Sequence, residues 1–135
     1  MILGIGTDLA DRRRFLRISE RYGRRFAQKI LTERELERFS SFGHSVKCAN
    51  YLAKQFAAKE AIAKALGTGF GLGVHPTQIE VLRLDSGAPV VHLSRAALAR
   101  SESLGIDRWW LTLSDDGDYA LAFAIGEGSG IKGII

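Results

Sequence analysis

The sequence predicts one domain of the α+β class, with helices and antiparallel strands grouped along different stretches of the chain. An apolar run at residues 2–7 indicates a buried strand, and the alanine-rich residues 46–66 indicate one long helix. Residues 109–113 and 119–125 flank an acidic turn and are typical of a hairpin. A chain of 135 residues is long enough for one hydrophobic core.

Composition narrows the functional classes without selecting one. The chain is 46% apolar and 25% charged, as in many folded soluble proteins, and its net charge of +4 favours an acidic partner. That partner could be nucleic acid, a phosphorylated cofactor or an acidic protein. The single cysteine excludes an internal disulfide, and no apolar run is long enough for a membrane span or a signal peptide. We therefore expect a cytoplasmic protein.

The opening of the chain predicts a strand followed by a helix. Asp8 stands where the strand at residues 2–7 is expected to end, and its glycines would let other backbone approach closely. Asp11 is a suitable N-cap for the helix that follows. Gly23 is expected to break or kink that helix, because glycine is a poor helix former.

The middle of the chain is predicted to be helical. Thr32 and Glu35 form the capping-box pattern of a short helix, and Gly67 is expected to terminate the long helix at residues 46–66. The glycine-rich residues 67–73 follow a helix and do not link a strand to a helix. This placement argues against a Rossmann or P-loop site.

The remainder of the chain predicts strands, a helix and a tail. Residues 79–84 and 90–93 are expected to pair across a turn, and Ser94 is expected to cap a helix that ends near Leu104. Residues 126–135 are glycine-rich and are predicted to be loose. The predicted division is a domain at residues 1–127 and a flexible tail at residues 128–135.

The long helix carries the residues with the clearest chemical meaning. Glu60 and Lys64 are four residues apart and share a helix face, which Lys59 flanks. Asp8 joins them if the helix packs over the end of the first strand. Two carboxylates beside lysines suit Mg²⁺ and phosphate, because Mg²⁺ takes one or two carboxylates together with phosphate oxygens and water. By spacing alone, an exposed helix with a surface ion pair explains the same residues and is the commoner arrangement.

Several separated motifs resemble those of the holo-acyl-carrier-protein synthases, a family of the 4′-phosphopantetheinyl transferase superfamily. The resemblance extends from Ile2 to about Glu127, with the motifs in the family's order. The motifs are residues 4–8 (Gly-Ile-Gly-Thr-Asp), Arg14, residues 56–61 (Phe-Ala-Ala-Lys-Glu-Ala), residues 64–69 (Lys-Ala-Leu-Gly-Thr-Gly), Gly87 with Pro89, and residues 113–115 with 119–120. Agreement at so many intervals favours a functional site over a surface ion pair.

The resemblance implies one reaction. Coenzyme A would donate its 4′-phosphopantetheine group to a serine hydroxyl of an apo-acyl carrier protein, and adenosine 3′,5′-bisphosphate would leave. We favour the carrier of fatty-acid synthesis, with a secondary-metabolite pathway as the alternative. It stays open whether a metal-linked water or a carboxylate takes the serine proton.

The resemblance also implies a role for each site residue. Asp8 and Glu60 would bind Mg²⁺ and form the catalytic group together with Lys64. Lys59 would lie near the phosphates, and Lys64 would steady or protonate the leaving phosphate. The nucleotide of coenzyme A would be lined by residues from the glycine loop and from later turns and strands: Gly67, Gly87, Pro89, Ser114 and Asp115.

The implied assembly is a homotrimer with sites between subunits, built on an antiparallel sheet packed against the long helix. Trp109 and Trp110 are adjacent on a predicted strand and would point to opposite faces, one into the core and one toward a neighbour. The alternative is that both are partly buried within one subunit. The acidic carrier would dock on the first helix through four arginines: Arg14, Arg17, Arg21 and Arg24.

Three positions depart from the family pattern. Gln55 and Asn50 stand where many members have arginine, and Ala88 stands where lysine is common. The lost cations raise the alternative of a degenerate paralogue that assembles but transfers weakly, unless Lys47 and Lys54 compensate. From another class, the basic composition permits a nucleic-acid-binding module, although no recognised nucleic-acid motif supports it.

Overall fold

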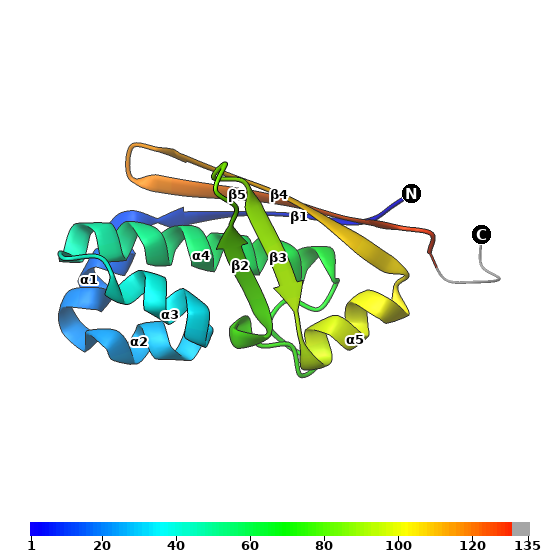
Figure 1. Cartoon of the computed structure of the whole chain (residues 1–135), viewed down its shortest axis with the longest axis horizontal. Coiled ribbons are helices and arrows are strands. Elements are labelled where there is room, and N and C mark those ends of the chain that lie inside the picture. Colours follow the sequence, from blue (N-terminus) through cyan, green and yellow to red (C-terminus); the bar gives the residue numbers. More distant parts are fainter. Residues whose placement is uncertain (131–135) are drawn as a thin grey trace.

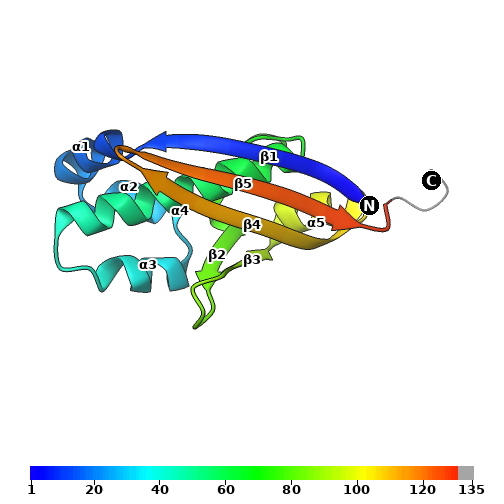
Figure 2. The same ribbon diagram turned by 90° about the horizontal axis from the view of Figure 1, so that it is seen from above.

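The computed structural model describes residues 1–130 and shows a sheet lying along one side of a long helix (Figure 1). The helix is α4 (Ser45–Ala65). The antiparallel sheet has the strand order β1 (Ile2–Asp11), β5 (Tyr119–Gly128), β4 (Ile106–Asp116). From above, its three strands run side by side across the helices (Figure 2). The predicted α+β class and the antiparallel sheet on a long helix are confirmed.

Helix α4 forms the centre of the molecule. Alanine, the best helix former, fills much of it, and its short side chain lets neighbouring elements approach. The His44 side chain caps the start by accepting a hydrogen bond from the Lys47 backbone N–H at 3.4 Å. Gly67, at a φ of 77°, allows the left-handed turn that follows the last helical turn. Among the described residues, no helix is both long and apolar enough to cross a membrane.

Glycines let β1 approach α4 closely. A Cβ atom on Gly4 would lie 2.1 Å from the carbonyl oxygen of Ala65, and one on Gly6 would lie 1.9 Å from that of Ala61. The neighbouring strand β5 also presents small buried residues on this side: Ala120, Ala122 and Ala124. The predicted close approach of other backbone to Gly4 and Gly6 is therefore confirmed.

Three short helices precede α4: α1 (Arg12–Tyr22), α2 (Arg24–Ile30) and α3 (Glu33–Ser40). The Asp11 side chain caps α1 by accepting a hydrogen bond from the Arg13 backbone N–H at 2.9 Å. Gly23, at a φ of 57°, separates α1 from α2. The capping box between Thr32 and Glu35 is also present, as the sequence predicts.

A second sheet stands apart from the first. It pairs β2 (Ile79–Arg83) with β3 (Pro89–Leu93), between the 3₁₀ turn η1 (Pro76–Gln78) and helix α5 (Arg95–Ser103). The predicted strand pair is confirmed, but the strands within residues 1–130 form two sheets. Ser94 occupies the N-cap position of α5, although its side chain makes no capping hydrogen bond.

Three strands extend beyond their predicted bounds. β4 runs from Ile106 to Asp116, whereas the sequence predicts residues 109–113. β1 continues to Asp11, so Asp8 lies within the strand, because residues 4–11 all pair with β5. β5 continues to Gly128, whereas the sequence predicts a loose segment from residue 126. Gly128 serves packing here, since a Cβ atom on it would lie 1.9 Å from the Gly105 carbonyl oxygen. Residues 131–135 of the predicted tail lie outside the described residues.

Candidate active site

Asp8 and Lys64 meet where β1 crosses α4. Side chains alternate along a strand, so Asp8 points to the helix side of β1, as do Gly4 and Gly6. The Lys64 Nζ donates to the Thr7 carbonyl oxygen at 3.0 Å and to Asp8 Oδ1 at 3.2 Å. The Asp8 side chain is 18% exposed and that of Lys64 is 51% exposed. At this junction the carboxylate of Asp8 is therefore largely buried, whereas the ammonium group of Lys64 is accessible to solvent and ligands.

Glu60 adds a second carboxylate to this junction. It lies one helical turn before Lys64 and is partly buried. Burial raises the pKa of Glu60, and the negative charge of Asp8 raises it further, while Lys64 and Arg14 oppose the shift. The two carboxylates therefore repel each other in a site that two cations flank.

The carboxylate oxygens of this pair suit a hard divalent cation such as Mg²⁺. Mg²⁺ is held by one or two carboxylates, with phosphate oxygens and waters in the other positions. Within residues 1–130, no cluster of three or more His, Cys, Asp and Glu side chains is placed to hold a metal ion. A cation here would offset the repulsion that raises the pKa of Glu60. The residues present thus fit the metal that the resemblance implies.

Lys59 does not lie in this site. The resemblance implies that it lies near the phosphates, but its side chain is 0% exposed. The Lys59 Nζ donates to Glu35 Oε1 at 2.7 Å, to the Pro76 carbonyl oxygen at 2.9 Å and to the Ile79 carbonyl oxygen. All three N–H groups are used within the protein, so none is left for a phosphate. The structure corrects the expected placement, because packing turns Lys59 toward α3 and β2.

The glycine loop begins directly after the site. The backbone N–H groups of Thr68 and Gly69 both bond to the Ala63 carbonyl oxygen, which folds the loop back on α4. The Leu66 carbonyl oxygen accepts a hydrogen bond from Arg100 Nε at 2.9 Å. Gly67 is therefore held close to Lys64, and its contact with a nucleotide stays a prediction.

Asp115 is held by two cations from other elements. Its carboxylate lies 2.7 Å from Lys54 Nζ and 3.8 Å from an Arg12 nitrogen. The hydrogen bond from Lys54 is the largest cause of its lowered pKa, with the charges of Lys54 and Arg12 adding to it. Ser114 precedes Asp115 on β4 and points to the opposite face of the sheet. These two residues therefore do not line the same surface of the chain.

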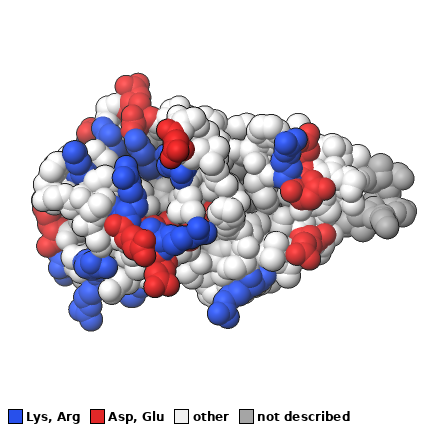
Figure 3. Space-filling model, viewed as in Figure 1, with Lys and Arg blue, Asp and Glu red and all other residues white. Residues whose placement is uncertain are grey.

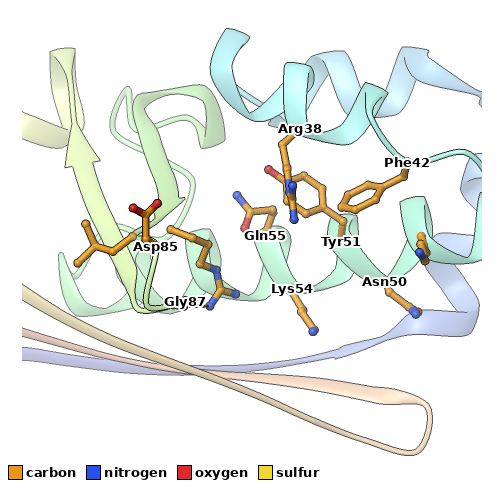
Figure 4. Close-up of a pocket in the computed structure, with 11 residues that line it drawn as sticks. Arg38, Phe42, Asn50, Tyr51, Lys54, Gln55, Asp85 and Gly87 are labelled. Atoms are coloured by element: carbon orange, nitrogen blue, oxygen red, sulfur yellow. Dashed lines mark hydrogen bonds between the residues drawn. The ribbon is translucent and has the colours of Figure 1, made fainter.

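A pocket of about 550 Å³ opens between α3, α4 and the second sheet (Figure 4). Its lining includes four cations and two aromatic rings: Arg38, Lys47, Lys54, Arg83, Phe42 and Tyr51. Gly87 lies in its wall, and among the described residues that line it only Asp85 is acidic. Such a pocket suits an anionic ligand, because the positive charges of its lining attract negative charge.

Sequence reasoning missed two of these cations. Asn50 and Gln55 line the pocket at positions where the family often has arginine, but Arg38 and Arg83 bring positive charge to the same space. Arg38 lies near the end of α3 and Arg83 ends β2, so neither belongs to a local motif. The proximity of Arg83 to the predicted turn at Gly87 is a sequence signal that could have found it.

The four arginines expected to dock a carrier protein are exposed. Arg14, Arg17 and Arg21 lie on α1, and Arg24 begins α2 after the break at Gly23. In the described part of the chain, none of the four arginines forms an ion pair with an acidic side chain. Figure 3 shows basic side chains gathered over the helical end of the molecule, with acidic ones among them. These arginines are available to an acidic surface.

The outer face of the main sheet is apolar and uncovered in one copy of the chain. Five large side chains on it are between 40% and 61% exposed: Ile5, Leu9, Trp110, Leu121 and Phe123. Trp109 points inward and donates to Ser101 Oγ at 3.2 Å, whereas Trp110 points outward and donates to Glu127 Oε1 at 2.9 Å. The two tryptophans thus lie on opposite faces, as the sequence predicts.

Comparison with known proteins places the chain in a family. Residues 4–124 match the 4′-phosphopantetheinyl transferase superfamily, and the chain belongs to it. The relatives are holo-[acyl-carrier-protein] synthases. That of Hydrogenovibrio crunogenus is 43% identical over 127 residues, or 94% of this chain and 98% of the relative. That of Shewanella amazonensis is 48% identical over 124 residues, or 92% of this chain and 97% of the relative.

Solved structures give the same assignment. The holo-[acyl-carrier-protein] synthase of Neisseria meningitidis has a TM-score of 0.83 at 42% identity and covers 94% of this chain and 99% of its own. A holo-(acyl-carrier-protein) synthase of Bacillus anthracis, in complex with CoA (3′,5′-ADP), has a TM-score of 0.79 at 32% identity. It covers 96% of this chain and 99% of its own.

Proposed function

We propose that this protein transfers the 4′-phosphopantetheine group of coenzyme A to a serine of an apo-acyl carrier protein, with release of adenosine 3′,5′-bisphosphate. The names of its relatives, one of them solved with coenzyme A, support this reaction. The observation that carries the proposal is the meeting of Asp8, Glu60 and Lys64 at the crossing of β1 and α4. These groups can hold and neutralise a pyrophosphate.

In this reaction the serine oxygen bonds to the phosphorus that carries the pantetheine, and the bond from that phosphorus to the oxygen of the nucleotide phosphate breaks. The serine proton passes to a carboxylate or to a water at this site, and the leaving nucleotide phosphate keeps the electron pair of the broken bond. Asp8 and Glu60 would hold Mg²⁺, and the metal would supply positive charge to offset that of the pyrophosphate oxygens. Lys64 has an exposed ammonium that can turn from Asp8 to the leaving phosphate and stabilise its charge.

The nucleotide end of coenzyme A is proposed to occupy the cation-lined pocket, with Gly87 in its wall. Arg38 and Arg83 are suited to bind its phosphate groups, since one guanidinium group can donate two parallel hydrogen bonds to the oxygens of a phosphate. Within one chain this pocket faces away from the carboxylates. Tyr51 and Glu60 are nine residues apart, and because each helical residue turns by about 100°, they project from opposite sides of α4.

A homotrimer resolves this separation, because a neighbouring copy can bring its pocket to the carboxylates of the first. The exposed apolar face of the main sheet supports such an assembly, since patches of this kind mark protein interfaces. An acidic carrier protein is proposed to dock on the arginines of α1 and α2, where charge attraction speeds association.

The direct test mixes the purified protein with coenzyme A, Mg²⁺ and an apo-acyl carrier protein and records the intact mass of the carrier. We expect a gain of one phosphopantetheine, which EDTA abolishes and which Asp8→Ala and Glu60→Ala nearly abolish. No gain with several carriers, despite a folded protein, would favour the degenerate paralogue. Salt-sensitive binding to RNA or DNA without binding of coenzyme A would favour the nucleic-acid module.

A further inference from the structure

The carboxylate of Glu35 lies completely buried at the centre of a polar network. Its Oε1 accepts hydrogen bonds from the Thr32 backbone N–H at 2.8 Å and from Lys59 Nζ at 2.7 Å. Its Oε2 accepts from Gln55 Nε2 at 2.6 Å and from the Val81 backbone N–H at 2.9 Å. Four donors therefore saturate one carboxylate whose side chain is 0% exposed.

The side-chain N–H groups of Gln55 and Lys59, which donate to Glu35, all have acceptors. Gln55 Nε2 also donates to the Val81 carbonyl oxygen at 3.0 Å, so both of its N–H groups have acceptors. Lys59 directs its remaining N–H groups to two backbone carbonyls at the start of the second sheet. We call Glu35, Gln55 and Lys59 the buried triad. Its geometry is fixed, because every donor has one available acceptor.

Stability alone does not account for the buried triad. Replacing a buried ion pair with apolar residues of similar volume is often neutral or stabilising, because removing two charges from water opposes folding. The same segments already pack through buried apolar residues such as Leu52, Ile62 and Ile79. A fully bonded triad differs from an apolar contact in directionality, since hydrogen bonds fix the distances and orientations of the elements that they join.

The elements joined by the buried triad are the walls of the cation-lined pocket. Glu35 lies on α3, one helical turn before Arg38. Val81, which both donates to and accepts from the triad, lies two residues before Arg83 on β2. Glu35 and Lys59 are not among the residues that line the pocket. They can therefore influence a ligand there only through the residues that they hold.

We propose that the buried triad is a positioning device that sets Arg38 and Arg83 at the spacing required by the nucleotide end of coenzyme A. This inference rests on the proposed function of the pocket. Glu35 and Lys59 are positioning residues, because they touch neither the substrate nor the reacting atoms. Their removal raises the KM for coenzyme A, while the chemical step at Asp8, Glu60 and Lys64 continues.

The test uses the double variant Glu35→Leu/Lys59→Met in the full-length protein. It replaces both charges with apolar side chains of similar volume, so no unpaired charge is left in the core. We expect the KM for coenzyme A and the Kd for adenosine 3′,5′-bisphosphate, measured by calorimetry, to rise about tenfold, since small misplacements of binding groups are costly. We expect kcat and the KM for the carrier to stay within about twofold.

Ile106→Ala is the matched control. It removes buried apolar volume at the start of β4, away from the pocket and from the junction of Asp8 and Glu60. If the triad has only a structural role, both variants change the midpoint of thermal unfolding and leave the KM for coenzyme A unchanged well below that midpoint. That result, or a loss confined to kcat, overturns the proposal.

The outcomes separate this inference from the proposed function. If the unmodified protein binds neither coenzyme A nor adenosine 3′,5′-bisphosphate, the proposed function fails. If the unmodified protein binds both and the double variant binds them equally well, the proposed function stands and the positioning role fails.

Discussion

Glu60 carries a charge that the folded protein disfavours. Burial and the neighbouring Asp8 raise its pKa, so the folded state binds this proton more tightly than the unfolded state does. Such a group contributes stability that is fully present below its unfolded pKa and is lost as the pH rises through its folded pKa. The charge that can hold a metal therefore opposes folding when the metal is absent.

Glu60→Gln should accordingly raise the midpoint of thermal unfolding at pH 7 without Mg²⁺, while abolishing transfer. The difference from the unmodified protein should be smallest below the ordinary glutamate value of about 4.3, because Glu60 is then protonated in both the folded and the unfolded state. Excess Mg²⁺ should stabilise only the unmodified protein. Circular dichroism melts with and without Mg²⁺ measure these effects, and a midpoint lowered at pH 7 would contradict the assigned environment of Glu60.

Asp115→Asn provides a comparison of opposite sign. The pKa of Asp115 is lowered by its hydrogen bond with Lys54 and by nearby positive charge, so its contribution to stability is present above the unfolded pKa and is lost as the pH falls through the folded pKa. We expect this variant to lower the unfolding midpoint slightly at pH 7, because the ion pair is partly exposed. The same melts record it, and a raised midpoint would exclude a stabilising role for the pair.

Charge and spacing marked Asp8, Glu60 and Lys64 as a candidate site, and the structure brings these three together, but the place of Lys59 was not predicted. Lys59 and Glu60 are adjacent in the sequence, and about 100° of helical rotation separates their directions. One of them points into the core and the other into the junction with β1. Lys59 is the buried one because Glu35 and Ile79 accept its hydrogen bonds. Both partners are distant in sequence, so a local sequence pattern cannot reveal them.

At the scale of elements, the contact between β1 and α4 determines the geometry of the site. The strand supplies Asp8 and the helix supplies Glu60 and Lys64, so their distance follows from how closely the two backbones approach. That approach is possible because Gly4 and Gly6 have no side chain. A residue that lies outside the candidate site can therefore control the distance between its carboxylates.

Gly6→Ala should reduce both stability and transfer. The added Cβ atom would lie 1.9 Å from the Ala61 carbonyl oxygen, so α4 must move away from β1. Overpacking of this kind costs about 1–3 kcal/mol in the free energy of unfolding. Urea denaturation and the carrier-mass assay measure the two effects. The matched control is Gly43→Ala, where no atom lies within 4 Å, and its stability should be nearly unchanged.

Helix α1 presents a row of arginines whose role is testable by charge reversal. Arg14→Glu/Arg21→Glu should raise the KM for the acidic carrier more than that for coenzyme A, and added salt should reduce the difference. Arg95→Glu, on α5 at the other end of the molecule, makes the same kind of charge change and serves as the control. Equal increases in both KM values would count against a docking surface on α1.

Local patterns predicted most elements because their signals lie within a few residues. The capping box at Thr32, the break at Gly23 and the end of α4 at Gly67 are examples. The ends of β1 and β5 were wrong, because they depend on pairing between residues more than 100 positions apart, such as Gly4 with Gly126. Gly126 and Gly128 are typical of a flexible tail when only the sequence is considered. In the structure they allow close packing, since a Cβ atom on either would clash with neighbouring atoms.

At the scale of the whole molecule, one copy of the chain separates its pocket from its carboxylates. If transfer occurs between subunits of a trimer, each site combines the carboxylates of one copy with the pocket of another. Two inactive variants, one without the carboxylates and one without the pocket, can then complement each other. In a mixed ring, some interfaces join the intact carboxylates of one variant to the intact pocket of the other.

Co-expression of Glu60→Gln with Arg38→Ser/Arg83→Ser should therefore restore about a quarter of the sites when the two chains mix randomly in a cyclic trimer. The carrier-mass assay measures this activity, and light scattering measures the number of copies. Each variant alone is the control. Leu9→Asp, on the outer face of the sheet, should yield single copies without transfer. Activity in such single copies would exclude sites between subunits.

The strand order β1-β5-β4 also has a consequence for synthesis on the ribosome. The middle strand of the main sheet is the last strand to be made, so a nascent chain ending before residue 119 contains β1 and β4 without their shared partner. Pairings between distant residues slow folding, because a long loop must close before they form. The apolar faces of β1 and β4 stay open until then, and α4 can form earlier from local contacts alone. Folding of this domain is thus a late event that follows translation of nearly all of the described chain.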